Sequence, residues 1–163
     1  VVAADLQPQR VGLVRTNVER LGADRVRLVV ADAARPPFRP GAADRVLLDA
    51  PCSGLGVLRR RPDARWRLEP AAVDRLAVLQ RRLLDAAVAL VRPGGVLVYS
   101  VCTLSSAETL GVDEHVGHAH PALEPLPPPG APWQPWGRGA ILLPQRAGTD
   151  GMFIARYRVP GAT

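Results

Sequence analysis

Hydrophobic and polar positions follow two recurring patterns along the chain. Short aliphatic runs that stop at an acid or at Pro, Gly, Ser or Thr predict buried strands, whereas apolar residues spaced three or four apart predict helices. The strand-like runs lie at residues 1–4, 26–31, 46–50 and 96–101. Helical spacing follows Pro8, a residue suited to a first helical turn, and recurs from Pro70 to the Pro-Gly-Gly segment at 93–95.

This order of strands and helices predicts an α/β fold with a mostly parallel sheet and right-handed crossovers. The rest of the chain is less regular. Residues 105–118 indicate a weaker helix, 123–126 a further strand and 127–139 a Pro-rich loop. Residues 141–143 and 152–159 alternate well enough to predict a terminal antiparallel hairpin. We expect residues 1–163 to form a single domain.

Composition supports a globular protein and adds one hint about partners. The 163 residues are 47% hydrophobic, and no apolar run approaches the length that crosses a bilayer. All 21 basic residues are arginine and the net charge is +6, which favours a polyanionic partner. GC-rich coding bias would give the same charge, so composition alone leaves both explanations open.

The two cysteines are the most informative positions, because each follows a strand-like run. Cys52 lies in Asp-Ala-Pro-Cys-Ser-Gly at 49–54, and Cys102 lies in Tyr-Ser-Val-Cys-Thr at 99–103. Ligands of open α/β sheets bind at the carboxyl ends of the strands, so we expect both thiols and Asp49 to share one crevice. This set suits nucleophilic chemistry on an electron-poor carbon. The residues alone do not rank the thiols, and a buried inert cysteine is the alternative for each.

Two further acids end the first two strand-like runs. In nucleotide-binding folds, a carboxylate at such a position accepts hydrogen bonds from ribose hydroxyls or from an adenine amino group. Asp5 and Asp32 are therefore candidates for ligand binding. The alternative is that each caps the turn that follows it.

Arginines crowd the connection that follows Cys52, with Trp66 among them. An arginine and aromatic mixture suits phosphates and an unstacked base, which favours RNA contact over a merely solvated charge run. The residues concerned are Arg59, Arg60, Arg61, Arg65 and Arg67. The histidines at 115, 118 and 120 have no metal-ligand partner nearby in the sequence, so we expect no metal site. Two free thiols suit a reducing cytoplasm.

At these residues the chain resembles the RNA cytosine-C5 methyltransferases of the Sun/Fmu family, the bacterial 16S ribosomal RNA enzymes above all. Residues 49–66 resemble the family's Pro-Cys motif with its arginine-rich extension. Residues 99–104, followed by Glu108, resemble its second cysteine motif, in which Thr is usual at the position of Val101. The segment Thr-Asp-Gly-Met-Phe-Ile-Ala at 149–155 resembles its closing Asp-Gly-Phe-Phe strand.

The resemblance implies a Rossmann-like class I methyltransferase with a C-terminal antiparallel hairpin. The family's first strand and glycine-rich loop would precede Val1, and the chain begins without Met inside a predicted strand. We therefore expect an N-terminally truncated catalytic domain. The implied cofactor is S-adenosyl-L-methionine, held by Asp5 with Arg10, by Asp32 and by Asp49.

The resemblance also implies roles for the site. Cys102 would attack C6 of cytosine, Asp49 would hold the pyrimidine edge, and Cys52 would assist removal of the C5 proton. The arginines Arg59, Arg60, Arg61 and Arg65 would contact RNA, with ribosomal RNA as the expected partner and no membrane partner. The alternatives are a non-catalytic RNA-binding module of the same fold and a methyltransferase that acts on tRNA, DNA or protein.

Overall fold

The computed structural model describes residues 1–66 and 68–161, so the predicted RNA contact at position 67 lies outside the described residues. The chain divides into two compact units, Val1–Arg39 and Pro40–Thr163.

The first unit is a strand–helix–strand motif, as the sequence predicts. Strands β1 (Val2–Asp5) and β2 (Arg27–Val30) pair in parallel, and helix α1 (Pro8–Arg20) connects them. Pro8 occupies the first turn of α1 because its missing N–H would have no partner there. Asp5 ends β1, and Asp32 follows the end of β2 by two residues. Both acids therefore lie at the carboxyl edge of this small sheet.

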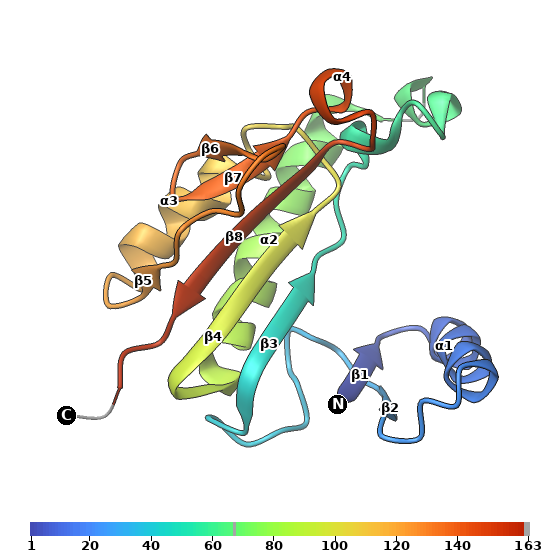
Figure 1. Ribbon diagram of the computed structural model, residues 1–163, viewed down its shortest axis with the longest axis vertical. Helices are drawn as coiled ribbons and strands as arrows, with labels where there is room; N and C mark the ends of the chain where they lie inside the picture. The colour runs from blue at the N-terminus through green and yellow to red at the C-terminus, as the bar shows by residue number, and fades with distance from the viewer. Residues whose placement is uncertain (67, 162–163) are drawn as a thin grey trace. The chain divides into compact units, whose positions relative to one another are not determined.

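A second parallel pair organises the larger unit. Strand β3 (Ala43–Asp49) pairs with β4 (Val91–Val101), and their register runs from Arg45 opposite Val96 to Asp49 opposite Ser100. Between them the chain forms two short 3₁₀ turns, Leu55–Val57 and Pro62–Trp66, and helix α2 (Pro70–Leu90). Helix α2 packs along the sheet (Figure 1).

The Pro-Gly-Gly segment at 93–95 was expected to end the helix, but it lies inside β4. Helix α2 ends earlier, at Leu90, and β4 begins at the next residue. The β3–β4 register shifts where Ala43 pairs with Val91 and Arg45 with Val96, so the segment forms an irregular bulge in the strand. Gly94 has a φ of +74° there, which glycine adopts without steric cost.

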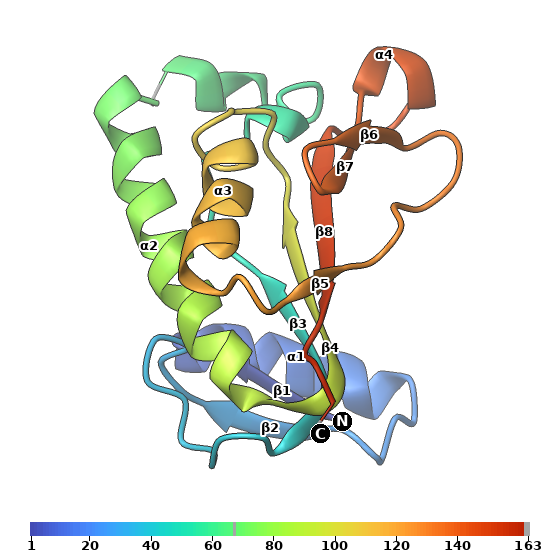
Figure 2. The ribbon, with the colours of Figure 1, turned by 90° about the vertical axis from the view of Figure 1, so that its left-hand side faces the viewer.

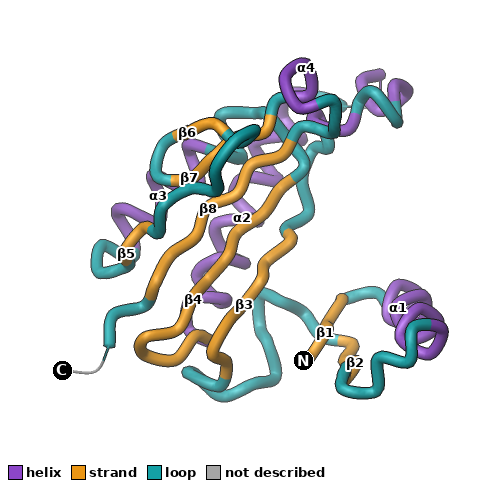
Figure 3. Tube along the Cα trace, viewed as in Figure 1, coloured by secondary structure: helices purple, strands orange, loops and turns teal. Residues whose placement is uncertain are grey.

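Antiparallel strands extend the larger sheet beyond the parallel pair (Figure 3). Strand β8 (Met152–Arg158) pairs with β4 on one side and with β7 (Gly139–Leu142) on the other, which confirms the predicted terminal hairpin. Strand β5 (Glu124–Pro125) also pairs with β8. Strand β6 (Gln134–Trp136) lies within the predicted loop and pairs with β7 at the sheet's edge, where its proline is tolerated. A short helix, α4 (Pro144–Ala147), connects β7 to β8.

Helices α2 and α3 (Leu110–Ala119) lie on the same side of the larger sheet (Figure 2). Helix α3 starts later than predicted, because residues 105–109 form a turn before it. The core beneath the helices contains Leu84, Leu97, Tyr99 and Phe153, all at most 1% exposed. Within the described residues, no helix is both long and apolar enough to span a bilayer.

Candidate functional site

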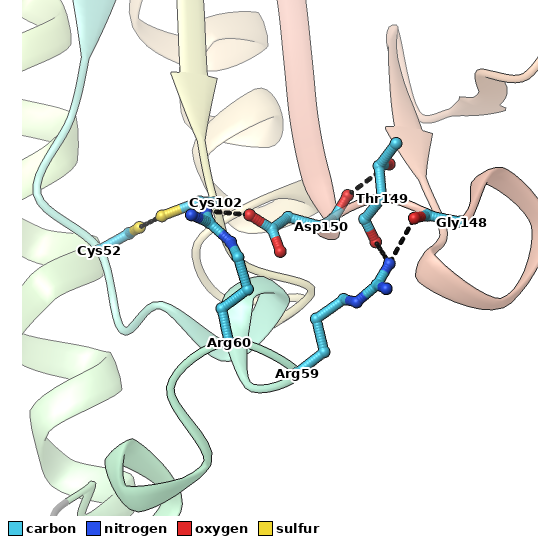
Figure 4. Close-up of polar contacts among 7 residues, drawn as sticks. All are labelled: Cys52, Arg59, Arg60, Cys102, Gly148, Thr149 and Asp150. Carbon is cyan, nitrogen blue, oxygen red and sulfur yellow. Dashed lines mark hydrogen bonds and ion pairs between the residues drawn. The ribbon is translucent and has the colours of Figure 1, made fainter.

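The two cysteines meet where the parallel strands of the larger unit end. Asp49 is the last residue of β3 and pairs with Ser100, so Cys52 and Cys102 follow neighbouring strands at the same edge. Their Sγ atoms lie 3.3 Å apart, and both thiols are half-buried and free (Figure 4). The structure therefore brings together two thiols that are 50 residues apart in the sequence.

The contact between the sulfur atoms makes the two thiols unequal. The hydrogen bond that Cys52 donates lowers the pKa of Cys102 to about 7, while burial and the nearby carboxylates of Asp49 and Asp150 oppose this shift. The pKa of Cys52 is raised, first by the same hydrogen bond and then by burial. Because the thiolate is the nucleophilic form, these two shifts favour Cys102 over Cys52 as the nucleophile near neutral pH.

A buried carboxylate fixes the loops that carry the thiols. Glu108 is fully buried, and its Oε1 accepts hydrogen bonds from the backbone N–H of Ser53 at 2.8 Å and from Nε2 of Gln80 at 3.0 Å. Its Oε2 accepts from the hydroxyls of Ser53 and of Thr103, the latter at 2.9 Å. Since Ser53 follows Cys52 and Thr103 follows Cys102, one side chain ties both cysteine loops together.

The same carboxylate network reaches into α2 and β4. Gln80 of α2 also donates to the carbonyl of Pro51 at 2.8 Å, and the Tyr99 hydroxyl donates to the carbonyl of Glu108 at 2.9 Å. Pro51, Tyr99 and Glu108 belong to the two cysteine motifs, but the sequence predicted no role at the site for Glu108 or Gln80. Gln80 has a detectable signal, because it is a polar residue on the otherwise apolar face of the predicted helix.

A close backbone approach joins the thiol site to the last strand. The N–H of Gly56 donates to the carbonyl of Cys102 at 3.0 Å, and the N–H of Gly151 donates to the carbonyl of Gly56 at 2.7 Å. A Cβ on Gly56 would lie 2.0 Å from the carbonyl oxygen of Gly151. Only glycine fits there, which explains the small residue four positions after Cys52.

Arginines and the loop before β8 form the outer rim of the thiol site (Figure 4). The Arg59 guanidinium donates to the carbonyls of Gly148 and Thr149, and Arg60 forms an ion pair with Asp150. Arg60 holds the pKa of the Asp150 carboxyl below its usual range. These residues line a shallow pocket of about 290 Å³.

The other two predicted RNA contacts are exposed on the same connection. Arg61 precedes the second 3₁₀ turn, and Arg65 lies within it. The Arg65 guanidinium lies 4.4 Å from the ring centroid of Trp66, whose side chain is 79% exposed. This pair presents a cation and an aromatic face to solvent, a combination on which nucleic-acid bases stack.

In the smaller unit, the two acids act as turn caps and retain further acceptor capacity. Oδ1 of Asp5 accepts from the N–H of Gln7, and Oδ1 of Asp32 accepts from the N–H of Ala34, both at 2.8 Å. Oδ2 of Asp5 lies 3.7 Å from the guanidinium of Arg10. Capping and ligand binding are thus compatible, because a carboxylate offers about four acceptor positions. The half-buried oxygens suit the hydroxyl and amino groups of a nucleoside.

Several solved structures with this fold are S-adenosylmethionine-dependent methyltransferases, the class to which the chain belongs. NSun6 from Pyrococcus horikoshii, solved with the S-adenosylmethionine analogue SFG, is 32% identical with a TM-score of 0.83 over 96% of this chain and 40% of its own. The N-methyltransferase NodS from Bradyrhizobium japonicum, solved with S-adenosyl-L-homocysteine, shares the fold alone, at 16% identity and a TM-score of 0.53 over 98% of this chain and 66% of its own.

The sequence profile of the 16S rRNA methyltransferase RsmB/F family matches residues 1–158, and the chain belongs to that family. A methyltransferase of Mycobacterium tuberculosis is 47% identical over 97% of this chain and 35% of its own length. The ribosomal RNA small subunit methyltransferase B of Thermus thermophilus is 41% identical over 97% of this chain and 39% of its own. The chain thus spans little more than a third of these relatives.

Proposed function

We propose that this chain supplies the catalytic centre of an S-adenosylmethionine-dependent RNA cytosine-C5 methyltransferase that acts on 16S ribosomal RNA. The 3.3 Å contact between the two sulfur atoms is the observation that carries the proposal. It gives one thiol that is partly ionised near neutral pH and a second thiol within reach of the same reacting base. The family and its named relatives support the RNA substrate.

In the proposed reaction, the Cys102 thiolate forms a bond to C6 of an unpaired cytosine. The electron pair of the C5–C6 double bond moves toward C5 and the ring, and Asp49 favours protonation at N3. The cofactor, when bound, supplies a methyl group on a sulfonium for C5 to take. Removal of the C5 proton then restores the double bond, and the bond between C6 and the Cys102 sulfur breaks. The base must be unstacked to reach the thiol.

The geometry favours Cys52 as the base for that proton. Its hydrogen bond to Cys102 is the largest cause of its raised pKa. Once the Cys102 sulfur is bonded to C6, it is neutral and no longer a thiolate acceptor for that hydrogen bond. Cys52 therefore becomes more acidic at the step that needs a thiolate base. In this sequence of events, Cys102 acts first as the nucleophile and Cys52 acts afterwards as the base.

We propose that Asp5, with Arg10, binds the cofactor ribose, that Asp32 binds the adenine and that Asp49 faces the methionine end. The two turn-capping acids at one sheet edge support the first two assignments. The family match covers both compact units, which supports one methyltransferase domain over residues 1–163. Free thiols at the site suit a reducing compartment such as the cytoplasm.

Trapping with RNA that carries 5-fluorocytosine tests the proposal in the complete protein. Fluorine at C5 cannot leave as a proton, so a covalent protein–RNA adduct accumulates if a cysteine attacks C6. We expect the adduct in the unsubstituted protein and its loss with Cys102→Ser. An adduct that survives this change but is lost with Cys52→Ser would reverse the two roles.

Two further measurements complete the test. Cys52→Ala should trap the protein on unmodified RNA, because the proton at C5 then stays in place. Bisulfite mapping of 16S ribosomal RNA from a deletion strain should show one or more cytosines that lose their methyl group. RNA binding without calorimetric heat from S-adenosylmethionine would instead identify a non-catalytic RNA-binding module.

A further inference from the structure

A second cluster of reactive side chains lies between α2 and α3, where the helices pack against each other. Asp85 belongs to α2, His115 to α3, and His120 caps the C-terminal end of α3. Oδ1 of Asp85 accepts hydrogen bonds from Nε2 of His115 at 2.8 Å and from Nε2 of His120 at 2.7 Å. These histidines have no partner nearby in the sequence, because Asp85 lies 30 residues before His115.

The cluster has the donor set of a transition-metal site. Its three ligand atoms, two imidazole nitrogens and one carboxylate oxygen, all lie within 4.8 Å of one another. Zinc is bound by such atoms at about 2.0–2.2 Å, which separates neighbouring ligands by roughly 3.3 Å. Nε2 and Oδ1 would thus have to move apart by only about half an ångström.

The surroundings leave room for this movement and for entry of an ion. The side chains of His115, His120 and Asp85 are 25%, 23% and 42% exposed. Three protein ligands leave at least one position of the ion for water. The histidine rings stand nearly perpendicular, with an interplanar angle of 83°, so their nitrogens approach the carboxylate from different directions.

We propose that Asp85, His115 and His120 form a binding site for a divalent transition-metal ion such as Zn²⁺, which clamps α2 to α3. Each Nε2 lone pair forms a coordinate bond, and the proton that Nε2 carried in its hydrogen bond to Asp85 is carried at Nδ1 instead. Both rings stay neutral, the carboxylate offsets part of the ion's charge, and no electron is transferred.

The position of the clamp connects it to the thiol site. Gln80 lies on α2 before Asp85, and Glu108 lies just before α3, so the clamped helices hold both ends of the 3.0 Å hydrogen bond between these residues. Metal binding should therefore stabilise the larger unit as a whole, and its effect does not depend on catalysis.

Metal titration of the complete protein tests the site, in a Cys52→Ser and Cys102→Ser background because the paired thiols would compete for zinc. We expect saturable binding of Zn²⁺ by calorimetry and a rise in Tm of roughly 5 °C at a hundredfold excess over Kd. Asp85→Ala, His115→Ala and His120→Ala should each weaken binding at least about tenfold. His118→Ala is the matched control, because His118 is exposed on the same helix and outside the cluster.

Histidine-selective NMR of the protein with its histidines intact provides a second measurement, independent of any folding defect in the variants. Zn²⁺ should shift the imidazole signals of His115 and His120 and leave those of His118 in place. The proposal is overturned if all three histidines respond alike or not at all. It is equally overturned if His118→Ala weakens binding as much as His115→Ala.

Discussion

The thiol pair is held from two sides that differ in burial and in the kind of bond. On the inner side, Glu108 is fully buried and accepts hydrogen bonds from both cysteine loops and from Gln80 of α2. On the outer side, Arg59 and Arg60 are largely exposed and contact the loop at 148–150. The inner bonds have no solvent to replace them, whereas water or a phosphate can replace the outer ones.

Because of this difference, we expect the inner side to fix the geometry of the thiol pair and the outer side to serve the recognition of RNA. Breaking a buried network leaves unsatisfied donors, which costs far more than breaking an exposed ion pair. Changes on the inner side should therefore alter stability and the spacing of the sulfur atoms. Changes on the outer side should leave the fold intact and alter how RNA binds.

The largest effect should come from Glu108→Ala, which removes the buried acceptor of the Ser53 N–H and one acceptor each of the Gln80 amide and the hydroxyls of Ser53 and Thr103. We expect the free energy of unfolding to fall by about 3 kcal/mol, measured by urea denaturation. Glu114→Ala is the control, because Glu114 is exposed on α3; it should change stability by no more than about 0.5 kcal/mol. Equal effects of the two substitutions would refute the inner role of Glu108.

Cys52→Ala should have the next largest effect, on the reactivity of Cys102. The hydrogen bond from Cys52 lowers the pKa of Cys102 to about 7, so its alkylation by iodoacetamide should rise with pH and be half-maximal near pH 7. Without the donor the midpoint should move up toward about 8.5, and the rate at pH 7 should fall roughly 15-fold.

Mass spectrometry of the alkylated peptide measures this pH profile. Cys52→Ser is the matched control, because its hydroxyl can still donate to the Cys102 sulfur and should keep the midpoint low. A profile that is unchanged in Cys52→Ala would show that the thiol contact does not set the acidity of Cys102.

Arg60→Ala should have a smaller effect, which is confined to the affinity for RNA. If Arg60 contacts one phosphate, its loss should reduce the slope of log affinity against log salt by about 0.7 for a single strand. The free energy of unfolding should stay nearly unchanged, because the ion pair with Asp150 is exposed on the arginine side. Arg92→Ala removes an exposed ion pair with Asp44 near the start of β3 and should leave the salt slope unchanged.

The smallest effect should come from Asp150→Asn. The Asp150 carboxylate raises the pKa of Cys102, so its neutralisation should move the alkylation profile to lower pH, by less than about half a unit in physiological salt. Asp44→Asn serves as the control and should leave the profile in place. A shift to higher pH would contradict the assigned direction.

The sequence predicted most of the strands, the main helices and the cysteine pair, because each has a local pattern. It did not predict the role of Glu108. An acid three residues after Ser105 is equally typical of a helix N-terminus, yet the carboxylate bonds to Ser53 across the sheet's edge. Such a contact depends on the fold that brings residues 53 and 108 together.

Asp85 was missed for the same reason, since its histidine partners belong to another helix. The prediction that Pro-Gly-Gly at 93–95 ends the helix was wrong because such residues occur both at helix ends and in bulges. Only the pairing of β4 with β3 distinguishes the two cases. The short strand β6 was hidden by its proline, which is tolerated because the strand has a single neighbour.

The hydrogen bond from Gly151 to Gly56 has a consequence for how the protein is made. Strand β4 lies between β3 and β8, so the segment that completes its pairing is translated some fifty residues after β4 itself. A nascent chain that has emerged only as far as α3 carries both cysteines but lacks the strand that closes their loops. The backbone contact between Gly151 and Gly56 can therefore form only after residues 151–158 have been translated.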